Sequence, residues 1–379
     1  MRLGIPLERT AHERRVAAVP ASVKAFTGWG WDVRVESGAG DAAGFTDAAF
    51  AEAGATIVAD AAAAHDADLV LRVDRPTFDE IALVPEGAIL AGFLDPFVAT
   101  DVIQALADRN ITALAVEAVP RTTLAQAMDA LSSQANVAGY AAVMLSAAES
   151  PKFPSMLVTA AGTIPPARAL VLGVGVAGLQ AIATFRRLGA IVHAYDIRPE
   201  TKEQVESLGA KFVEAPTQEM DEGGYAKEVD EETAAKQQEV LAEFVAKADL
   251  VVTTAQIPGR PAPRLINADV VASMHPGSVI VDMAASSGGN VEGSLPGEAV
   301  DVNGVTILGP IDLPSRVATD ASRMYARNLQ ELVGRWRTDD GIAVDLNDEV
   351  AGPATITSGG EIINPRTRSA MGLEAVSYT

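Results

Sequence analysis

Three glycines near the middle of the chain have the types and spacing of a phosphate-binding turn. Gly173, Gly175 and Gly178 follow the apolar run Ala169–Leu172 and precede a helical pattern that ends at Leu188. In such a turn the first glycine permits a tight bend, the second lets the backbone approach a pyrophosphate, and the third lets helix and strand pack closely. Free N–H groups at the start of the helix then face the phosphates. The spacing therefore predicts a nucleotide site, against the alternative of an ordinary glycine-rich turn.

An acidic residue after the next apolar run supports a dinucleotide ligand. The run Ile191–Tyr195 ends at Asp196, which follows Gly173 at roughly the 20-residue spacing of such sites. Its carboxylate can accept hydrogen bonds from ribose hydroxyls and would repel a 2′-phosphate, so NAD is favoured over NADP. Two alternatives stay open: Arg198 could meet a phosphate, and Asp196 could cap the helix that follows Pro199.

Composition limits the class of protein. The 379 residues suggest two domains, and 48% hydrophobic residues suffice to bury two cores. A net charge of −21 argues against nucleic acid or an anionic membrane surface as partner. The absence of cysteine excludes disulfides and thiolate chemistry and fits a reducing cytosol. The four histidines lack metal-ligand spacing, so no metal is expected, and no signal peptide or membrane-spanning segment is predicted.

Short apolar runs alternate with helical patterns along the chain, which predicts an α/β fold with largely parallel sheets. The predicted strands are Leu3–Ile5, Val33–Glu36, Thr56–Val58, Leu69–Val73, Ile89–Phe93, Thr112–Val116, Leu250–Thr253, Val279–Asp282 and Thr306–Leu308. The predicted short helices are Ala21–Thr27, Ala48–Ala53 and Thr100–Asp108.

Two long helical patterns, 127–150 and Ser322–Arg337, are expected to link the halves of the chain. The expected architecture is two Rossmann-like, doubly wound parallel-sheet domains joined by these helices, with a cleft between them. The expected domains are residues 1–126 with 325–379, and residues 127–324. The tail Ile342–Pro365 resembles hairpin material.

An acidic segment between Phe212 and Gln237 interrupts this order. Loops of this length in compact domains are often lids or disordered segments. Gly223 and Gly224 would serve as a hinge and Tyr225 would close on a ligand. A solvated insertion with an incidental tyrosine explains the composition equally well.

The first linking helix carries neutral polar residues and a single acid where a solvated face would usually carry Lys and Glu. At 100° per residue Asp129, Ser133, Asn136 and Tyr140 share one face, flanked by Gln126 and Ser132. That stripe suits a polar pocket, with Arg121 at its mouth or in water. The rival interpretation is a capping box formed by Thr123 and Gln126.

The polar stripe lacks an obvious acid–base group. A dehydrogenase acting on an alcohol or amine moves a proton together with its hydride and needs such a group. Hydride transfer between two nicotinamides needs only two rings held at near-attack distance. The uncharged stripe favours this second chemistry.

The sequence resembles the NAD(H)-binding component of proton-translocating NAD(P) transhydrogenases, a family related to the alanine dehydrogenases. The resemblance covers essentially the whole chain and rests on several motifs. They are Ile5-Pro6-x-Glu8 with Glu13-x-Arg15 and Pro20, Arg121 with Gln126 to Tyr140, the glycine turn with Asp196-x-Arg198, Gly223-Gly224-Tyr225, Thr253-Thr254-Ala255 through Pro263, and Pro314-Ser315-Arg316. The chain departs from the family pattern at Val19, Leu124 and Asp312.

The resemblance implies a role for each motif. Arg121, Gln126, Asp129 and Ser132 would hold the nicotinamide of NAD(H) against NADP(H) on a partner subunit. The residues implied in binding the rest of the cofactor are Gly173, Gly175, Val176, Ala177, Gly178, Asp196, Ile197, Arg198, Tyr225, Thr254, Ala255, Gln256 and Pro258. The implied reaction is reversible hydride transfer between NADH and NADP+, coupled to proton translocation by a separate membrane-spanning subunit. The chain would be a cytoplasmic homodimer attached to the membrane through its partner subunits.

Two other functions stay open from the sequence. In an alanine dehydrogenase the catalytic histidine would fall within Phe93–Pro96, where this chain has Asp95, a group that is normally ionised near neutrality. Arg15 and Arg72 stand near positions that such an enzyme uses for its substrate carboxylate, or they only pair with acids. The third possibility is a non-catalytic NAD-binding redox sensor.

Overall fold

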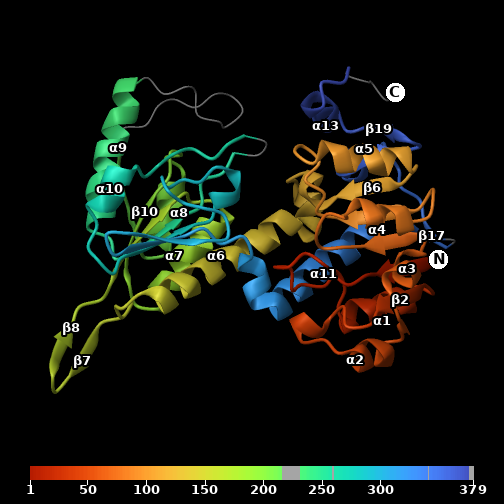
Figure 1. Cartoon of the computed structure of the whole chain (residues 1–379), viewed down its shortest axis with the longest axis horizontal. Coiled ribbons are helices and arrows are strands. Elements are labelled where there is room, and N and C mark those ends of the chain that lie inside the picture. Colours follow the sequence, from red (N-terminus) through yellow and green to blue (C-terminus); the bar gives the residue numbers. More distant parts are fainter. Residues whose placement is uncertain (216–230, 258–259, 340, 375–379) are drawn as a thin grey trace. The chain divides into compact units, whose positions relative to one another are not determined.

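The computed structural model describes residues 1–215, 231–257, 260–339 and 341–374, which form two compact units. Unit 1 comprises Met1–Gln134 and Pro314–Thr379, and unit 2 comprises Ala135–Leu313 (Figure 1). Contacts in unit 1 include the hydrogen bonds from Ser133 Oγ to Asn328 Oδ1 and from Gln134 Nε2 to the Ala321 carbonyl. The division therefore falls after Gln134 and before Pro314.

The sheet of unit 1 has eight strands. They are β1 (Arg2–Ile5), β2 (Asp32–Glu36), β3 (Thr56–Val58), β4 (Leu69–Leu71), β5 (Ile89–Gly92), β6 (Thr112–Ala115), β18 (Thr355–Ser358) and β19 (Glu361–Ile362). Their order is β19-β18-β6-β5-β4-β1-β2-β3. β1 to β6 are parallel, and the β18–β19 hairpin adds antiparallel strands at one edge. The order reverses at β1, which makes this a doubly wound sheet.

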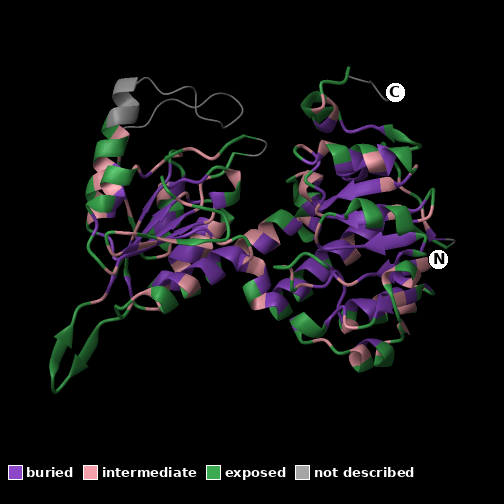
Figure 2. Cartoon of the chain, viewed as in Figure 1, coloured by how far each residue is buried: buried purple, intermediate pink, exposed green. Residues whose placement is uncertain are grey.

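Helices cover both faces of this sheet, as parallel strands require. They are α1 (Pro20–Gly28), α2 (Asp47–Glu52), α3 (Ala61–His65), α4 (Phe78–Leu83), α5 (Thr100–Asp108), α11 (Ala318–Gly334), α12 (Ala351–Ala354) and α13 (Pro365–Ala370). One core cluster includes Phe26 of α1, Phe50 of α2 and Leu329 of α11, and another includes Ile81 of α4 and Ile103 of α5. Figure 2 shows the buried strands between these layers.

The sheet of unit 2 has seven strands in the order β11-β10-β9-β12-β13-β15-β14. They are β9 (Arg168–Leu172), β10 (Ile191–Tyr195), β11 (Lys211–Phe212), β12 (Leu250–Thr253), β13 (Val279–Asp282), β14 (Ala299–Val302) and β15 (Val305–Leu308). All pairs are parallel except β14 with β15. The order reverses at β9, and in such folds ligands bind outside the carboxyl ends of the strands at this point.

The helices of unit 2 are α7 (Val176–Arg187), α8 (Thr201–Ser207), α9 (Glu231–Ala246) and α10 (Ala268–Ala272). A longer helix, α6 (Ala130–Glu149), begins in unit 1 and enters unit 2. Small residues on α6 allow a close approach to α7, because a Cβ at Gly139 would lie 2.2 Å from the Ala177 carbonyl oxygen. A two-stranded hairpin, β7 (Leu157–Thr159) and β8 (Gly162–Ile164), extends from unit 2 with every strand residue exposed (Figure 2).

The structure confirms the expected α/β class with two Rossmann-like units and each predicted strand, but it corrects the helices. The pattern 127–150 is an α-helix only from Ala130, preceded by the 3-10 helix η3 (Thr123–Met128). The second long helix is α11, which starts and ends before the predicted limits. Residues 231–237 of the predicted acidic loop belong to α9. The β7–β8 hairpin, α3 and α4 were not predicted; each strand of the hairpin has three residues, and α3 and α4 have five and six.

Candidate functional site

The first glycine of the turn adopts the backbone conformation that the predicted tight bend requires. Gly173 follows β9 with φ +96°, in the left-handed region that L side chains rarely adopt. Its N–H donates to the Tyr195 carbonyl at 2.9 Å, and the Thr254 hydroxyl donates to its carbonyl at 3.0 Å. A Cβ at this position would lie 2.6 Å from Thr254 Oγ1. Conformation and packing thus both require glycine here.

The other two glycines serve different purposes. A Cβ at Gly178 would lie 1.9 Å from the Gly173 carbonyl oxygen, so this glycine permits the helix to pack on the turn. A Cβ at Gly175 would meet no atom within 4 Å, and its φ of −79° suits any residue. The fold itself therefore does not require glycine at 175, which leaves room for a ligand beside the backbone. Val176 and Ala177 begin α7, where unpaired N–H groups favour an anion.

Asp196 lies beside this turn at the end of β10 and is 7% exposed. Its Oδ2 accepts from the Val174 N–H at 2.7 Å, and Oδ1 accepts from the Arg198 N–H at 2.9 Å. The Arg198 guanidinium donates to both oxygens, at 3.0 and 3.1 Å. These hydrogen bonds to Asp196 raise the pKa of Arg198. The carboxylate therefore anchors the turn and holds the arginine, while Ile197 between them is exposed.

A third segment borders the turn after β12. Thr254 and Ala255 are half-buried, and the exposed Gln256 donates to the Met283 carbonyl at 3.1 Å. Asn290 is fully buried and fixes this segment, since its amide donates to the Ala255 carbonyl at 2.9 Å and its oxygen accepts from the Ala255 N–H at 3.1 Å. The carboxyl ends of β9, β10 and β12 thus present the three predicted segments along one edge of the sheet.

Asn290 and Asp282 are residues of this edge that the sequence prediction missed. Asp282, at the end of β13, is fully buried and accepts from the Thr253 hydroxyl at 3.0 Å and the Val291 N–H at 3.1 Å. The available signal was a polar residue directly after the apolar run Val279–Val281, followed within ten residues by Gly-Gly-Asn. Tyr225 and Pro258, both predicted cofactor contacts, lie outside the described residues.

The candidate nicotinamide residues lie in unit 1, where η3 meets α6. Asp129 precedes the first residue of α6, and its carboxylate accepts from the Ser132 N–H at 2.8 Å and the Ser132 hydroxyl at 2.6 Å. Such a cap satisfies an orphan N–H of the helix and contributes about 1 kcal/mol. Arg121 and Gln126 are both exposed. The structure thus brings Asp129 and Ser132 into direct contact at the helix start.

The predicted common helix face is corrected by this arrangement. Gln126 belongs to η3 and Asp129 caps α6, so neither lies on the α-helix that the periodicity assumed. Ser133, predicted on the polar face, donates to Asn328 Oδ1 at 2.6 Å. The rival capping box of Thr123 and Gln126 is also wrong. The N-cap position of η3 is Thr122 rather than Thr123, and no side-chain hydrogen bond caps this helix.

Buried ion pairs occupy the arginines that a substrate carboxylate would need. The Arg72 side chain is 2% exposed and contacts Glu80 at 2.9 Å and Glu8 at 3.3 Å. Arg15 contacts Glu13 at 2.6 Å and Gln134 Oε1 at 2.9 Å. Burial raises the pKa of Glu8 to about 7, although Arg72 opposes this. The expectation that these arginines pair with acids is confirmed.

At the position of the dehydrogenase histidine, Asp95 has φ +49° and contacts Arg75 at 3.1 Å. Burial raises its pKa. Glu117 Oε1 accepts from the Leu94 and Asp95 N–H groups at 2.8 and 2.5 Å, and burial raises the pKa of Glu117 to about 7. Among the described residues no group of acids and histidines could hold a metal, and no helix is long and apolar enough to cross a bilayer.

Both halves of the chain match one family. Residues 4–138 match the N-terminal domain, and residues 142–365 the C-terminal domain, of the family described as alanine dehydrogenase/PNT. The chain belongs to this family. Membership agrees with the two Rossmann-like units and with the position of the glycine turn in the second.

Named relatives of this alanine dehydrogenase/PNT chain include transhydrogenases and alanine dehydrogenases. The first portion of the divided NAD(P) transhydrogenase subunit alpha of Rhodospirillum rubrum is 48% identical, over 96% of this chain and 98% of the relative. A crystal structure of transhydrogenase from Sinorhizobium meliloti is 44% identical with a TM-score of 0.88, over 96% of this chain and 100% of that one. An alanine dehydrogenase of Halomonas elongata is 31% identical, over 85% of this chain and 84% of the relative. The transhydrogenases are thus the more similar group of these relatives.

Proposed function

We propose that this chain is the NAD(H)-binding component of a proton-translocating NAD(P) transhydrogenase. It would exchange hydride reversibly between its own NAD(H) and NADP(H) bound to a partner subunit. The observation that carries the proposal is the turn at Gly173–Gly178, where the one glycine that packing does not require faces open space. The 48% identity to a transhydrogenase alpha subunit supports the choice of reaction.

In this proposal the pyrophosphate lies against Gly175 and the N–H groups of Val176 and Ala177. Thr254, Ala255 and Gln256 border the same sheet edge as Asp196, Ile197 and Arg198, and all would contact the rest of the nucleotide. Asp196 already holds Arg198 through two side-chain contacts. Because Asp196 holds Arg198, the guanidinium is not directed to a 2′-phosphate, and the Asp196 carboxylate would repel one. This is the physical reason for choosing NAD. Tyr225 and Pro258 are retained as proposed contacts from the sequence alone.

Arg121, Gln126, Asp129 and Ser132 would orient the nicotinamide, which supplies or receives the hydride. The exposed Arg121 and Gln126 are free to meet a ligand, while Ser132 is held by Asp129. Positioning of this kind can contribute several kcal/mol to a transfer reaction without any proton donor. The proton translocation would belong to a separate membrane-spanning subunit, with this chain on the cytoplasmic side of the membrane.

We also propose that the chain forms a homodimer, supported by the β7–β8 hairpin. The segment 153–164 contains no charged residue, and its exposed apolar side chains include Phe153, Met156 and Val158, which are 55%, 60% and 66% exposed. An isolated two-stranded hairpin is marginally stable in water, so packing against a second copy would stabilise it. A Val158→Asp variant should sediment as a monomer where the parent chain sediments as a dimer. Dimers of unchanged stability would rule out the hairpin as the contact.

Reconstituted transfer tests the reaction directly. The full chain is combined with a separately expressed NADP(H)-binding component, and hydride transfer from NADPH to an NAD analogue is followed optically, beside calorimetric NADH binding. Gln126→Asn should slow transfer far more than it weakens NADH binding, because the proposed role is orientation. Gln104→Asn is the matched control, because Gln104 lies on α5 and its side chain donates to Asp108 of the same helix. Equal losses of affinity and rate in Gln126→Asn would contradict the role.

Alanine dehydrogenase activity is the second candidate, favoured by the shared family. The ion pairs of Arg72 and Arg15 count against it, since a substrate carboxylate would have to displace buried acids. NADH oxidation with pyruvate and ammonium measures it, and fast turnover would replace the transhydrogenase proposal. Tight NADH binding with no transfer to any acceptor would instead indicate a redox sensor.

A further inference from the structure

A concave site lies at the amino-terminal half of the unit 2 strands, away from the glycine turn at their carboxyl ends. Strand register places Lys211, His193 and Leu170 side by side on β11, β10 and β9. Two residues earlier, Ile191 pairs with Arg168. Because side chains alternate between faces along a strand, all five point to the same face of the sheet.

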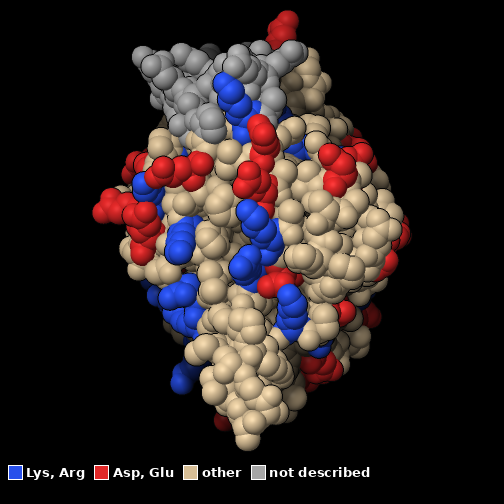
Figure 3. Space-filling view, turned by 90° about the vertical axis from the view of Figure 1, so that its left-hand side faces the viewer, with Lys and Arg blue, Asp and Glu red and all other residues tan. Residues whose placement is uncertain are grey.

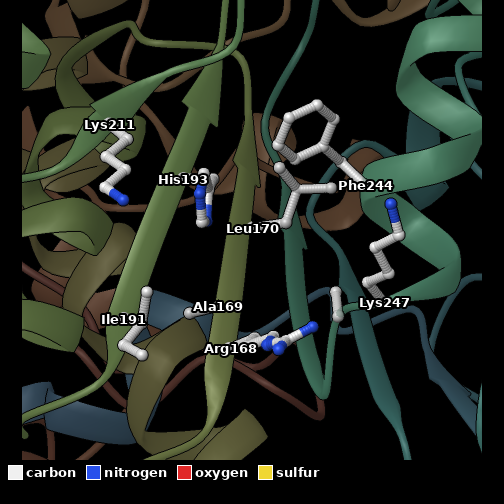
Figure 4. A pocket seen from close by; sticks show the side chains of 9 residues that line it. Arg168, Ala169, Leu170, Ile191, His193, Lys211, Phe244 and Lys247 are labelled. Carbon is white, nitrogen blue, oxygen red and sulfur yellow. The ribbon is translucent and has the colours of Figure 1, made fainter.

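Helix α9 closes this face into a pocket. The Phe244 ring lies 5.3 Å from the His193 ring, and Lys247 directly follows the last residue of α9. The pocket has a volume of about 310 Å³. Figure 4 shows Lys211 and Lys247 on opposite sides, with His193 and Leu170 between them and Arg168 below. Cationic side chains thus surround a floor and wall of apolar groups.

The charge of this pocket is opposite to that of the chain. The chain carries a net charge of −21, yet the residues that line the pocket include Arg168, Lys211 and Lys247 and no acid. Among the described residues, no carboxylate pairs with the side chains of Arg168 or Lys211. Figure 3 shows several Lys and Arg side chains in the middle and on the left of one face, with Asp and Glu above, beside and between them.

Glu243 and Asp249 adjoin the lining residues Phe244 and Ala248 in sequence, but neither neutralises the charge of the pocket. Glu243 contacts Lys247 at 3.5 Å, with both side chains well exposed, and such pairs are weak. Asp249 is engaged by Lys152 and by the Arg168 N–H at 2.9 Å. Burial, and then the charges of Lys211 and Arg168, lower the pKa of His193. The field at the imidazole is therefore positive, as an anion site requires.

We propose that this pocket binds a small soluble phosphate monoester whose organic group is apolar or aromatic. Three cationic side chains and no acid among the lining residues favour a doubly charged anion such as a phosphate, and Leu170, Ile191 and Phe244 suit an apolar substituent. The site is separate from the proposed nucleotide site, because it lies at the amino-terminal half of β9 and β10 and the glycine turn follows the carboxyl end of β9.

Phenyl phosphate is the probe, and the imidazole of His193 is the reporter. The chain has four histidines, so the Cε1–H signals can be assigned by comparison with a His193→Gln variant. A bound dianion should raise the pKa of His193 by about half a unit or more and leave the other histidines unchanged. Calorimetry gives the affinity in parallel. Inorganic phosphate should bind more weakly than phenyl phosphate, and phenol should not bind.

Charge-neutral variants then locate the contact. Lys211→Gln and Lys247→Gln should each weaken phenyl phosphate binding by about fivefold, the effect of losing one partly exposed charge contact. Both side chains are exposed, so these variants should fold. Lys24→Gln, an exposed lysine on α1 of unit 1, removes the same charge elsewhere and should leave the affinity unchanged.

Three outcomes would overturn the assignment. A His193 signal that does not respond to phenyl phosphate would show that the pocket binds no such anion. If Lys24→Gln weakened phenyl phosphate binding as much as Lys211→Gln and Lys247→Gln, the effect would come from the net charge of the chain and not from the pocket. Binding to phosphatidic acid vesicles without any response to phenyl phosphate would identify a lipid surface rather than a soluble ester. None of these results depends on whether the chain binds NAD(H).

Discussion

Two glycines of the same turn should fail in different ways when each gains a methyl group. In Gly178→Ala the new Cβ would lie 1.9 Å from the Gly173 carbonyl oxygen and 2.9 Å from its carbonyl carbon. Both are backbone atoms of a tight turn, so neither can rotate away. Overpacking of this kind typically costs about 1–3 kcal/mol, and we expect the upper half of that range for the free energy of unfolding.

Gly175→Ala is the matched control in the same turn. The added Cβ would meet nothing within 4 Å, and a φ of −79° is allowed to alanine. Alanine is less favourable than glycine at a helix N-cap, which lowers stability, but it also reduces the entropy of the unfolded chain, which raises stability. The free energy of unfolding should therefore change by less than about 1 kcal/mol. The methyl group would instead occupy space beside the backbone that the pyrophosphate is proposed to approach.

The expected loss in Gly175→Ala is therefore in NADH affinity. A clash of about 1–3 kcal/mol with the ligand corresponds to a dissociation constant raised by roughly 5- to 150-fold. Urea denaturation reports the stability of each variant, and calorimetric titration with NADH reports the affinity. Measurements of both variants at the same temperature and salt concentration separate the two effects.

Unchanged NADH affinity in Gly175→Ala would refute the assignment of this turn to the pyrophosphate. Full stability in Gly178→Ala would contradict the packing argument by itself and leave the ligand argument intact. A variant with both losses at position 175 would mean that the turn had rearranged, and a crystal structure of that variant would then be required.

Further predictions concern unit 1. Burial raises the pKa of Glu117 from 4.5 to about 7, so the protonated carboxyl favours the folded state at low pH. This contribution to the free energy of unfolding is fully present below pH 4.5 and is lost as the pH rises through 7, by up to about 3 kcal/mol. Urea denaturation at about pH 5 and about pH 8 should show that Glu117→Gln lacks this part of the pH dependence. Asp129→Ala should lose about 1 kcal/mol of stability and Asp129→Asn almost none, because asparagine also caps helices. Tyr325→Phe should cost about 1–2 kcal/mol by calorimetry, since the buried hydroxyl donates to the Arg72 carbonyl at 2.7 Å.

The sequence predicted those parts of the fold in which local and tertiary requirements agree. Strands such as Leu250–Thr253 are apolar throughout because both faces of a parallel sheet are covered, and their limits matched closely. The glycine turn was predictable because steric demands on Gly173 and Gly178 leave no other residue type. Short elements such as α3 (Ala61–His65) contain too few residues for any periodicity to be seen.

The start of α6 was predicted wrongly for a physical reason. Residues Gln126 to Asp129 have reasonable helix propensity, so periodicity continued the helix through them. The carboxylate of Asp129 instead accepts from the Ser132 N–H and hydroxyl, and this local cap begins the α-helix at Ala130 rather than at residue 127. Asn290 was missed for the opposite reason, because its partners Ala255 and Pro263 are remote in sequence.

The bond between Asp129 and Ser132 also bears on the chemistry. The Ser132 hydroxyl donates its proton to Asp129 Oδ2 at 2.6 Å, so that proton is not available to a ligand. What the serine can offer is an accepting oxygen, held in a fixed direction by the helix cap. The exposed Gln126 and Arg121 side chains add hydrogen-bond donors. In the proposed function, these donors and acceptors would orient the carboxamide of the nicotinamide, and hydride exchange between two nicotinamides requires such positioning.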